Sequence, residues 1–153
     1  MKRTMWATLA VCVAAAAVSI AADVNVGTWK LNPGKSKIGA GAARNETVKI
    51  ETAGDNMKVT VDGKDAAGKA AHNEWTGKFD GKEYPVTGDP TADARSYKQV
   101  NDHSWTLAQK KGGTVITTGR IAVSPDGKTR TVTTTTTDPQ GKKVSSTAVF
   151  DKQ

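Results

Sequence analysis

Apolar and polar residues alternate along most of the chain, as they do in β-strands that bury one face and expose the other. The clearest example is the segment 45–61, where Val48 and Ile50 share one face of a strand and Val59 and Val61 share one face of the next. A Gly-Asp-Asn turn separates the two runs. Although large apolar residues are sparse, this sustained period of two predicts an ordered β-hairpin rather than a disordered chain.

Turn signals recur along the chain at roughly 8–12 residues, the spacing expected of an antiparallel sandwich or barrel. The predicted strands cover 23–31, 45–52, 57–61, 69–76, 83–86, 94–100, 103–110, 114–124, 129–138 and 143–151. Between the first two strands, 35–43 is expected to be a loop with at most one short helical turn, because Gly39 and Gly41 disfavour a helix. Pro85 marks its strand as an edge strand or a bulge.

About nine or ten strands joined by tight turns favour an all-β, antiparallel up-and-down barrel over a Greek key, which needs long crossovers. Gly27 and Trp29 open the first strand. The glycine allows another backbone to come close, and the indole can fill one end of a closed sheet. The sequence leaves open which faces of the strands 69–76 and 129–138 point inward.

The first 22 residues have the parts of a secretory signal peptide. Lys2 and Arg3 form a charged start, and an apolar run over 6–20 is followed by small residues, which predicts cleavage after Ala21 or Ala22. An uncleaved membrane anchor is the alternative, but the run is short for a membrane span.

The leader also determines how the rest of the chain is divided. We expect a signal peptide at 1–22, a single barrel domain at 23–153, and export to the periplasm or the extracellular space. Cys12 lies inside the leader and follows Val11, whereas a lipoprotein signal needs a small residue there. Cleavage removes this cysteine, so the mature chain has no disulfide and no thiol nucleophile.

Composition argues against several other functions. The formal net charge of +7 falls to +5 without Lys2 and Arg3, and most basic residues are scattered, as on a solvated surface. We therefore expect no nucleic-acid partner, while a weak affinity for anionic envelope polymers stays open. His72 and Glu74 share a strand face without an evident third ligand, and no Gly-x-Ser-x-Gly or phosphate-loop motif occurs. We expect no metal, no cofactor and no catalytic activity.

Several motifs resemble known barrel families. The segment 26–31, Val-Gly-Thr-Trp-Lys-Leu, resembles the first strand of the lipocalins and fatty-acid-binding proteins, the calycin barrels. The segments 79–88, 123–128 and 149–153 resemble small exported bacterial proteins of lipocalin-like type whose role is mostly uncharacterised. This second resemblance covers nearly the whole mature chain and implies a closed barrel.

The chain departs from the fatty-acid-binding pattern in two respects. Those proteins hold a carboxylate with an Arg-x-Tyr on the last strand, whereas the last predicted strand here reads Thr-Ala-Val-Phe at 147–150. Arg95 and Tyr97 have the matching spacing on a middle strand, which we interpret as coincidence. A helical lid is also missing from the predicted elements.

Five aromatic residues are candidates for the wall of an interior cavity: Trp29, Trp75, Tyr97, Trp105 and Phe150. Small residues alternate among the larger ones on the faces interpreted as inward, namely Thr117, Gly119, Ser146 and Ala148. A barrel of this strand number encloses more space than these side chains fill.

Two hypotheses follow from this composition of the interior. In the first, the barrel binds a small, partly apolar ligand. In the alternative, the barrel is filled, and its loops, such as 35–43 and 88–93, bind another envelope protein or a polymer.

Overall fold

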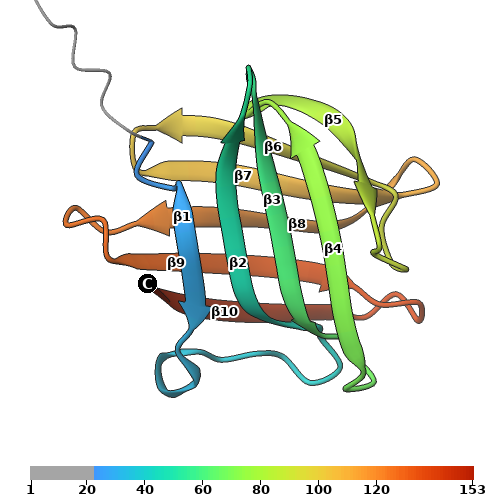
Figure 1. Cartoon of the computed structure of the whole chain (residues 1–153). Coiled ribbons are helices and arrows are strands. Elements are labelled where there is room, and N and C mark those ends of the chain that lie inside the picture. The colour runs from blue at the N-terminus through green and yellow to red at the C-terminus, as the bar shows by residue number, and fades with distance from the viewer. Residues whose placement is uncertain (1–22) are drawn as a thin grey trace, which may run out of the picture.

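The computed structural model describes residues 23–153, which form ten antiparallel strands in one closed barrel. Each strand pairs with its neighbours in sequence, and the first also pairs with the last (Figure 1). The strands are β1 (Gly27–Leu31), β2 (Arg44–Ala53), β3 (Asn56–Lys64), β4 (Ala70–Gly77), β5 (Asp80–Thr87), β6 (Ala94–Asn101), β7 (Ser104–Lys111), β8 (Thr114–Val123), β9 (Thr129–Thr137) and β10 (Lys143–Lys152). The prediction of an all-β up-and-down barrel is therefore confirmed.

The signal peptide predicted at 1–22, with Cys12, lies outside the described residues and stays a prediction. Within residues 23–153, no helix is long and apolar enough to cross a membrane.

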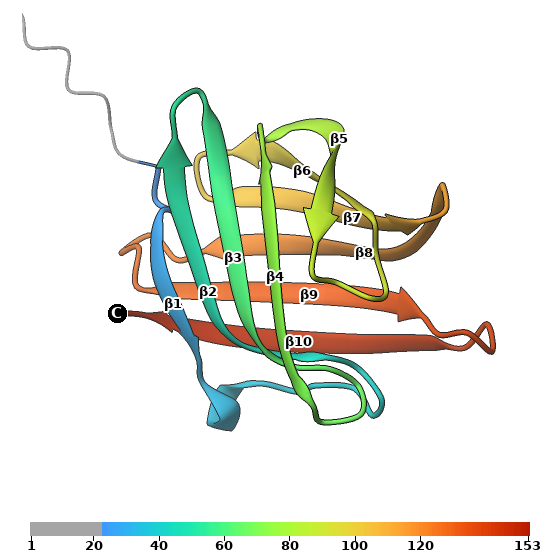
Figure 2. The same ribbon diagram turned by 45° about the vertical axis from the view of Figure 1, so that its right-hand side comes forward.

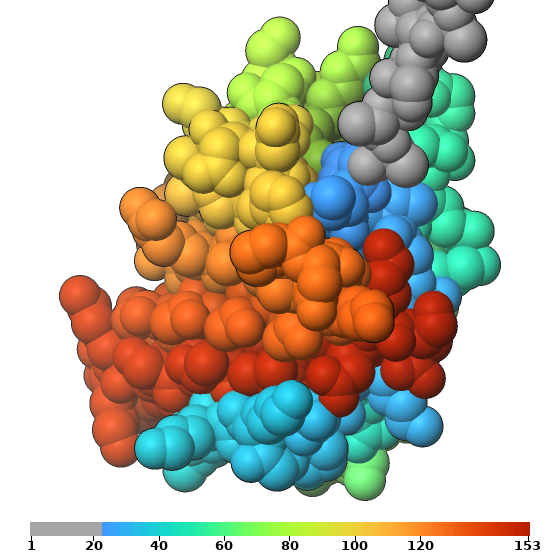
Figure 3. Space-filling view, turned by 90° about the vertical axis from the view of Figure 1, so that its left-hand side faces the viewer, coloured from blue at the N-terminus to red at the C-terminus, as the bar shows by residue number. Residues whose placement is uncertain are grey.

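Closure of the barrel brings the two ends of the domain together. Trp29 pairs with Lys152 and Leu31 with Phe150, and the backbone N–H of Gln153 donates to the carbonyl of Thr28 at 2.9 Å. The segment that follows β1 begins with a short 3₁₀ turn, η1 (Pro33–Lys35). It then lies along the last strand, as the cyan segment beside the red one in Figure 3 shows, and Lys37 and Thr147 form an isolated bridge there.

The interior is filled from both halves of the barrel. Strands β2 to β4 run across the direction of β6 to β10 (Figures 1 and 2), so their inward side chains meet from opposite sides. The predicted phase is confirmed, because Val48, Ile50, Val59 and Val61 are all buried. The β7–β8 hairpin turns through Gly112 and Gly113, whose φ angles of 56° and 79° are those that a tight hairpin turn requires.

Two strands begin three or more residues away from their predicted starts. β1 begins at Gly27, because residues 23–26 form a turn closed by a hydrogen bond from the Val26 N–H to the Asp23 carbonyl at 3.0 Å. β5 begins at Asp80 instead of Glu83, because Asp80 pairs with Lys98 on β6. Of the two alternatives predicted from Pro85, the edge strand is excluded because β5 pairs on both sides, whereas a bulge-type register shift does occur in β5, between Asp80 and Glu83.

Candidate ligand site in the barrel interior

The inward faces of β7 to β10, together with the end of β1, form cross-strand rows, and the size of their side chains changes from one row to the next. The first row is Val123, Arg130, Phe150 and Leu31; the second is Trp105, Ile121, Val132 and Ala148; the third is Leu107, Gly119, Thr134 and Ser146. The whole first row is buried, whereas the third is half-buried throughout. The barrel interior is therefore packed more tightly at the first row than at the third, although Thr117, the next inward position on β8, is buried again.

The third row, which we call the small-residue row, has little side-chain volume. It contains a glycine, a serine and a threonine, with Leu107 as its only large member. Gly119 has no room for a side chain, because a Cβ atom there would lie 2.6 Å from the carbonyl oxygen of Thr133 and 3.4 Å from Cγ of Leu107. Val132 and Ala148 in the second row are also half-buried, so partly exposed apolar surface lies next to partly exposed hydroxyl groups.

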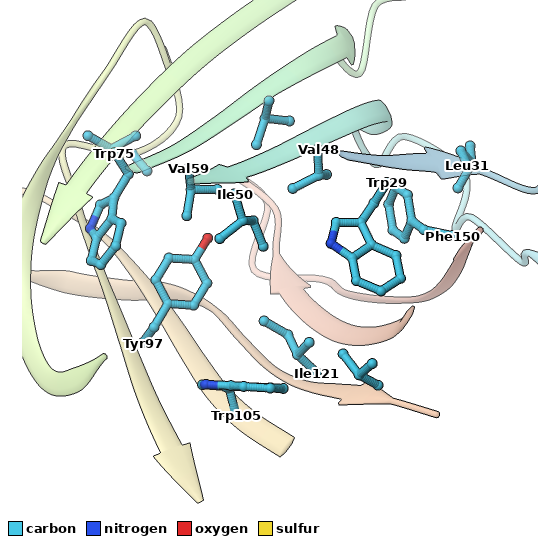
Figure 4. Packing of buried hydrophobic residues seen from close by; sticks show 14 residues of the cluster. Trp29, Leu31, Val48, Ile50, Val59, Trp75, Tyr97, Trp105, Ile121 and Phe150 are labelled. Atoms are coloured by element: carbon cyan, nitrogen blue, oxygen red, sulfur yellow. The ribbon is translucent and has the colours of Figure 1, made fainter. Parts of the chain in front are cut away.

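All five predicted wall residues lie in the barrel core, where their exposed fractions are 0–6%. The structure brings three of them together around Phe79. Trp75 and Tyr97 meet edge to face at 4.8 Å between ring centroids, and Phe79 contacts both of them and Trp105. Trp29 and Phe150 lie apart from this group, on the other side of Ile50 and Ile121 (Figure 4). Their role as a ligand wall stays a prediction.

The indole N–H groups of the three core tryptophans differ in their partners. Trp29 Nε1 donates to the Asn25 carbonyl and Trp75 Nε1 donates to the Arg95 carbonyl, each at 2.9 Å. Trp105 Nε1 is buried and has no hydrogen-bond partner within the described part of the chain. The ammonium of Lys152 lies 5.0 Å from the Trp29 ring centroid, a cation–π contact that closes this end of the barrel.

Two arginines point into the interior, and the sequence did not identify either as a site residue. Arg95 is 4% exposed, and its guanidinium contacts Asp89 Oδ2 at 3.3 Å and Asn73 Oδ1 at 3.2 Å. When the side-chain amide of Gln109 is turned so that its oxygen faces Arg95, this oxygen accepts from the same guanidinium at 2.9 Å. Because the charge of Arg95 is already paired, its spacing to Tyr97 does not make a free carboxylate-binding pair, which supports the interpretation of that motif as coincidence.

Arg130 is the second inward arginine and is also 4% exposed. Its Nε donates to Asn25 Oδ1 at 2.9 Å, and its guanidinium carbon lies 5.8 Å from the centroid of Phe150. Burial lowers the pKa of Arg130 to about 10, so the side chain still carries its charge at neutral pH. Arg130 and Val132 are two residues apart and share a strand face, so assigning Val132 to the core would also have placed Arg130 inward. The threonines around them show no apolar alternation, so the sequence does not indicate which face is inward.

The predicted His72–Glu74 pair lies on the outer face of the barrel. His72 Nδ1 lies 2.6 Å from Asp62 Oδ1 on β3, and Nε2 lies 3.5 Å from Glu74 Oε1. Within residues 23–153, no group of three His, Cys, Asp or Glu side chains is arranged to hold a metal ion. A shallow depression of about 330 Å³ lies beside His72 and is open to solvent.

Comparisons with known proteins find matches among solved structures alone. The sequence matches no protein-family model and no curated protein sequence. The chain is similar to a solved structure of a redesigned β-barrel, mFAP1, bound to DFHBI. The match has 14% sequence identity and a TM-score of 0.41, and it covers 82% of this chain and 94% of that one.

Proposed function

We propose that this chain is an exported, non-catalytic barrel that binds a small, partly apolar ligand inside. The observation that carries the proposal is the half-buried small-residue row (Leu107, Gly119, Thr134 and Ser146) next to a fully packed aromatic core. Export and a calycin-type identity are supported by the sequence of the leader and by the Gly-x-Trp of β1.

The chemistry of the accessible half suits a ligand of mixed polarity. Leu107, Val132 and Ala148 offer apolar contacts, while Thr134 and Ser146 supply hydroxyl groups. Ligand sites in proteins are mostly apolar with a few placed polar groups, which is the composition found here. Trp105 lies in the same cross-strand row as Val132, so a ligand here would approach the indole and alter its fluorescence.

Blocking the accessible half tests the proposal. We expect Ala148→Trp to weaken binding of the neutral dye N-phenyl-1-naphthylamine by about tenfold or more, because the larger ring would occupy the proposed site beside Val132, the cross-strand partner of Ala148. The matched control is Ala122→Trp, at an exposed position on β8. Dye fluorescence and tryptophan fluorescence are measured in titrations. Equal binding by both variants would contradict an interior site, and no saturable response from the unmodified protein would contradict ligand binding itself.

The packing of the aromatic core favours a second candidate, a filled barrel that acts as an interaction module. In this case the segments 35–43 and 88–93 would contact an envelope protein or polymer; the second is held in place by the Asp89–Arg95 ion pair. A barrel of this kind shows no saturable dye binding and yet retains a partner in pull-downs from envelope extract. A pull-down that returns nothing would count against it.

Export has its own test. Mass spectrometry of the protein recovered from the periplasm or the culture medium should find a chain that begins after Ala21 or Ala22. Recovery of the chain only with its leader attached, in the membrane fraction, would contradict cleavage.

A further inference from the structure

The two halves of the barrel differ in the charges of their strands. Strands β2 to β5 contain six carboxylate side chains: Glu46, Glu51, Asp62, Glu74, Asp80 and Glu83. Strands β6 to β9 contain none, and β10 has Asp151 alone, next to its last residue. Apart from the Arg95–Asp89 pair, every ion pair found among residues 23–153 uses one of those six carboxylates. The outside of β6 to β10 therefore has an excess of positive charge that its own strands do not balance.

One cross-strand row on this outer face combines cations with hydroxyl groups. Traced through the paired residues of successive strands, this row, which we call the basic stripe, is Lys98, Thr106, Arg120, Thr133, Thr147 and Lys37. Directly paired residues point to the same side of a sheet, and the three cations of the stripe are all exposed. Figure 3 shows the segments that carry the stripe in the same order, from yellow through orange and red to cyan.

The cations of the stripe are spaced by whole strands. Neighbouring strands lie roughly 4.8 Å apart, so the backbone of Arg120 is about 10 Å from that of Lys98 and about 14 Å from that of Lys37. Within residues 23–153, no ion pair involves any of the three. The stripe therefore presents three separate positive charges along one line.

A shallow hollow of about 420 Å³ opens to solvent in the middle of the stripe. Its lining includes Arg120 and four threonines, namely Thr106, Thr118, Thr133 and Thr135. The outward neighbours on β7 and β8 are the small residues Ala108 and Ala122, and Arg120 is exposed. The hollow therefore offers one unpaired guanidinium surrounded by hydroxyl groups.

The carboxylate that faces the end of the stripe is bonded elsewhere. Asp80 on β5 is the cross-strand partner of Lys98. Its Oδ1 accepts from the Lys82 backbone N–H and its Oδ2 accepts from the Tyr84 hydroxyl, each at 2.9 Å. Among the described residues it forms no ion pair with Lys98. Lys98 can therefore bind an anion from outside the barrel.

We propose that the basic stripe binds an acidic polysaccharide, which lies across the outside of β6 to β10 with one of its anionic groups on Arg120. A guanidinium makes charge-assisted hydrogen bonds to anionic oxygens, and threonine hydroxyls both donate to and accept from sugar hydroxyls. Lys98 and Lys37 can contact further anionic groups of the same chain, which strengthens binding without a deep pocket. This inference goes beyond the interior ligand site and does not depend on it.

The composition of the same face argues against two other polyanions. Single-stranded nucleic acids stack their bases on aromatic side chains, but the aromatic residues of β6 to β10, Tyr97, Trp105 and Phe150, are all buried. Attachment to a lipid surface combines basic residues with apolar side chains that enter the bilayer. Among residues 23–153 the exposed large apolar side chains are Val100 and Val115, which lie beside the turns at opposite ends of β7 and form no patch.

The competing explanation is that the stripe is a solvated face. Threonine favours β-strands, and scattered lysines and arginines keep a protein soluble. In that case any attraction to a polyanion would depend on the net charge of the protein, and it would not matter which face lost its cations.

The test compares dextran sulfate with dextran, which share a backbone and differ in charge, by isothermal titration calorimetry at neutral pH. We expect the unmodified protein to bind dextran sulfate at least about tenfold more tightly than dextran. Replacing both Lys98→Gln and Arg120→Gln should weaken dextran sulfate binding by about tenfold, because two charged contacts are lost. The matched control, Lys49→Gln with Lys64→Gln, removes two exposed lysines from β2 and β3 and should change the affinity less than about twofold. Equal weakening by the two double variants overturns the stripe.

A second pair of variants tests the contacts to sugar hydroxyls. Thr118→Val with Thr133→Val removes two hydroxyls of the hollow and keeps the charge and the branched side chains, and it should weaken dextran sulfate binding by about threefold. The control, Thr60→Val with Thr76→Val, makes the same change on the outer face of β3 and β4 and should leave the affinity unchanged. If neither pair changes the affinity, the stripe attracts charge alone and the polysaccharide assignment is wrong.

Two further titrations examine the other polyanions. At an equal concentration of negative charge, vesicles of phosphatidylglycerol and phosphatidylcholine, and an oligothymidylate, should both bind more weakly than dextran sulfate. Tighter binding of either one overturns the polysaccharide proposal. No binding of dextran sulfate also overturns it and leaves the interior site in place, because dye binding measures that site separately.

Discussion

His72, on the outer face of the barrel, has a pKa that is raised by two neighbouring carboxylates. The hydrogen bond to Asp62 is the largest influence and raises the pKa of His72 above its ordinary value of 6.5, and Glu74 acts in the same direction. Because the folded pKa exceeds the unfolded one, the protonated histidine stabilises the fold. That contribution is complete below the unfolded pKa and disappears as the pH rises through the folded pKa.

We therefore expect His72→Gln to lower the free energy of unfolding more at about pH 5 than at about pH 8, when stability is measured by urea denaturation. Since Asp62 is the first cause, the same substitution in an Asp62→Asn background should lose most of this pH dependence. An equal cost at both pH values would contradict the assignment. Both side chains are more than half exposed, so the effect should also weaken in high salt.

At the scale of the strands, β4 and β5 form the weakest junction in the barrel. Only two residue pairs join them, Glu74 with Thr87 and Trp75 with Val86. Beyond these pairs, aromatic packing replaces backbone pairing. Tyr84 meets Trp75 edge to face at 5.7 Å between ring centroids, and its ring lies against Gly77, while Phe79 stacks on Trp75. The junction therefore depends on the missing side chain of Gly77.

A Cβ atom at Gly77 would lie 2.4 Å from Cγ of Tyr84 and 2.8 Å from the Trp75 ring. We expect Gly77→Ala to destabilise the barrel by about 1–3 kcal/mol, because two packed rings must move. Gly34→Ala is the control: its Cβ would meet only Asn32 Oδ1, at 3.6 Å, and it should change stability by less than about 0.5 kcal/mol. Similar denaturation midpoints for the two variants would show that the junction is not tightly packed.

The alternation was sufficient to predict the strands, because period two is a property of each strand alone, and the tight turns between them predicted their up-and-down order. It failed at β5, where Asp80 becomes a strand residue only through pairing with Lys98, a partner that local turn signals do not reveal. The five aromatic residues were correctly predicted to lie inside. Arg130 was missed for a physical reason: a single arginine among threonines gives no hydrophobic signal, and its burial depends on Asn25, far away in sequence.

At the scale of the whole molecule, closure makes every strand an interior strand. β1 and β10 pair like any other neighbours, and Asn32 Nδ2 donates to Asp151 Oδ2 at 2.7 Å across the same junction. The first and last strands of residues 23–153 lie beside each other, since the Gln153 N–H donates to the Thr28 carbonyl. Opening the chain at a new position should therefore cost little stability, unless the new opening lies next to a core side chain and frees the backbone on one side of it.

A circular permutant tests this argument. A glycine–serine linker joins Gln153 to Asp23, and the chain is opened between Gly112 and Gly113, whose added Cβ atoms would meet nothing within 4 Å. We expect its free energy of unfolding to stay within about 2 kcal/mol of the parent chain, because the cut frees only a tight exposed turn. A second permutant, opened between Lys78 and Phe79, releases the ring that contacts Trp75, Tyr97 and Trp105, and it should be less stable than the first by about 1–3 kcal/mol. Near-ultraviolet circular dichroism and urea denaturation measure both. If the first permutant failed to fold, or if the two were equally stable, the barrel would depend on its native ends rather than on its closed core.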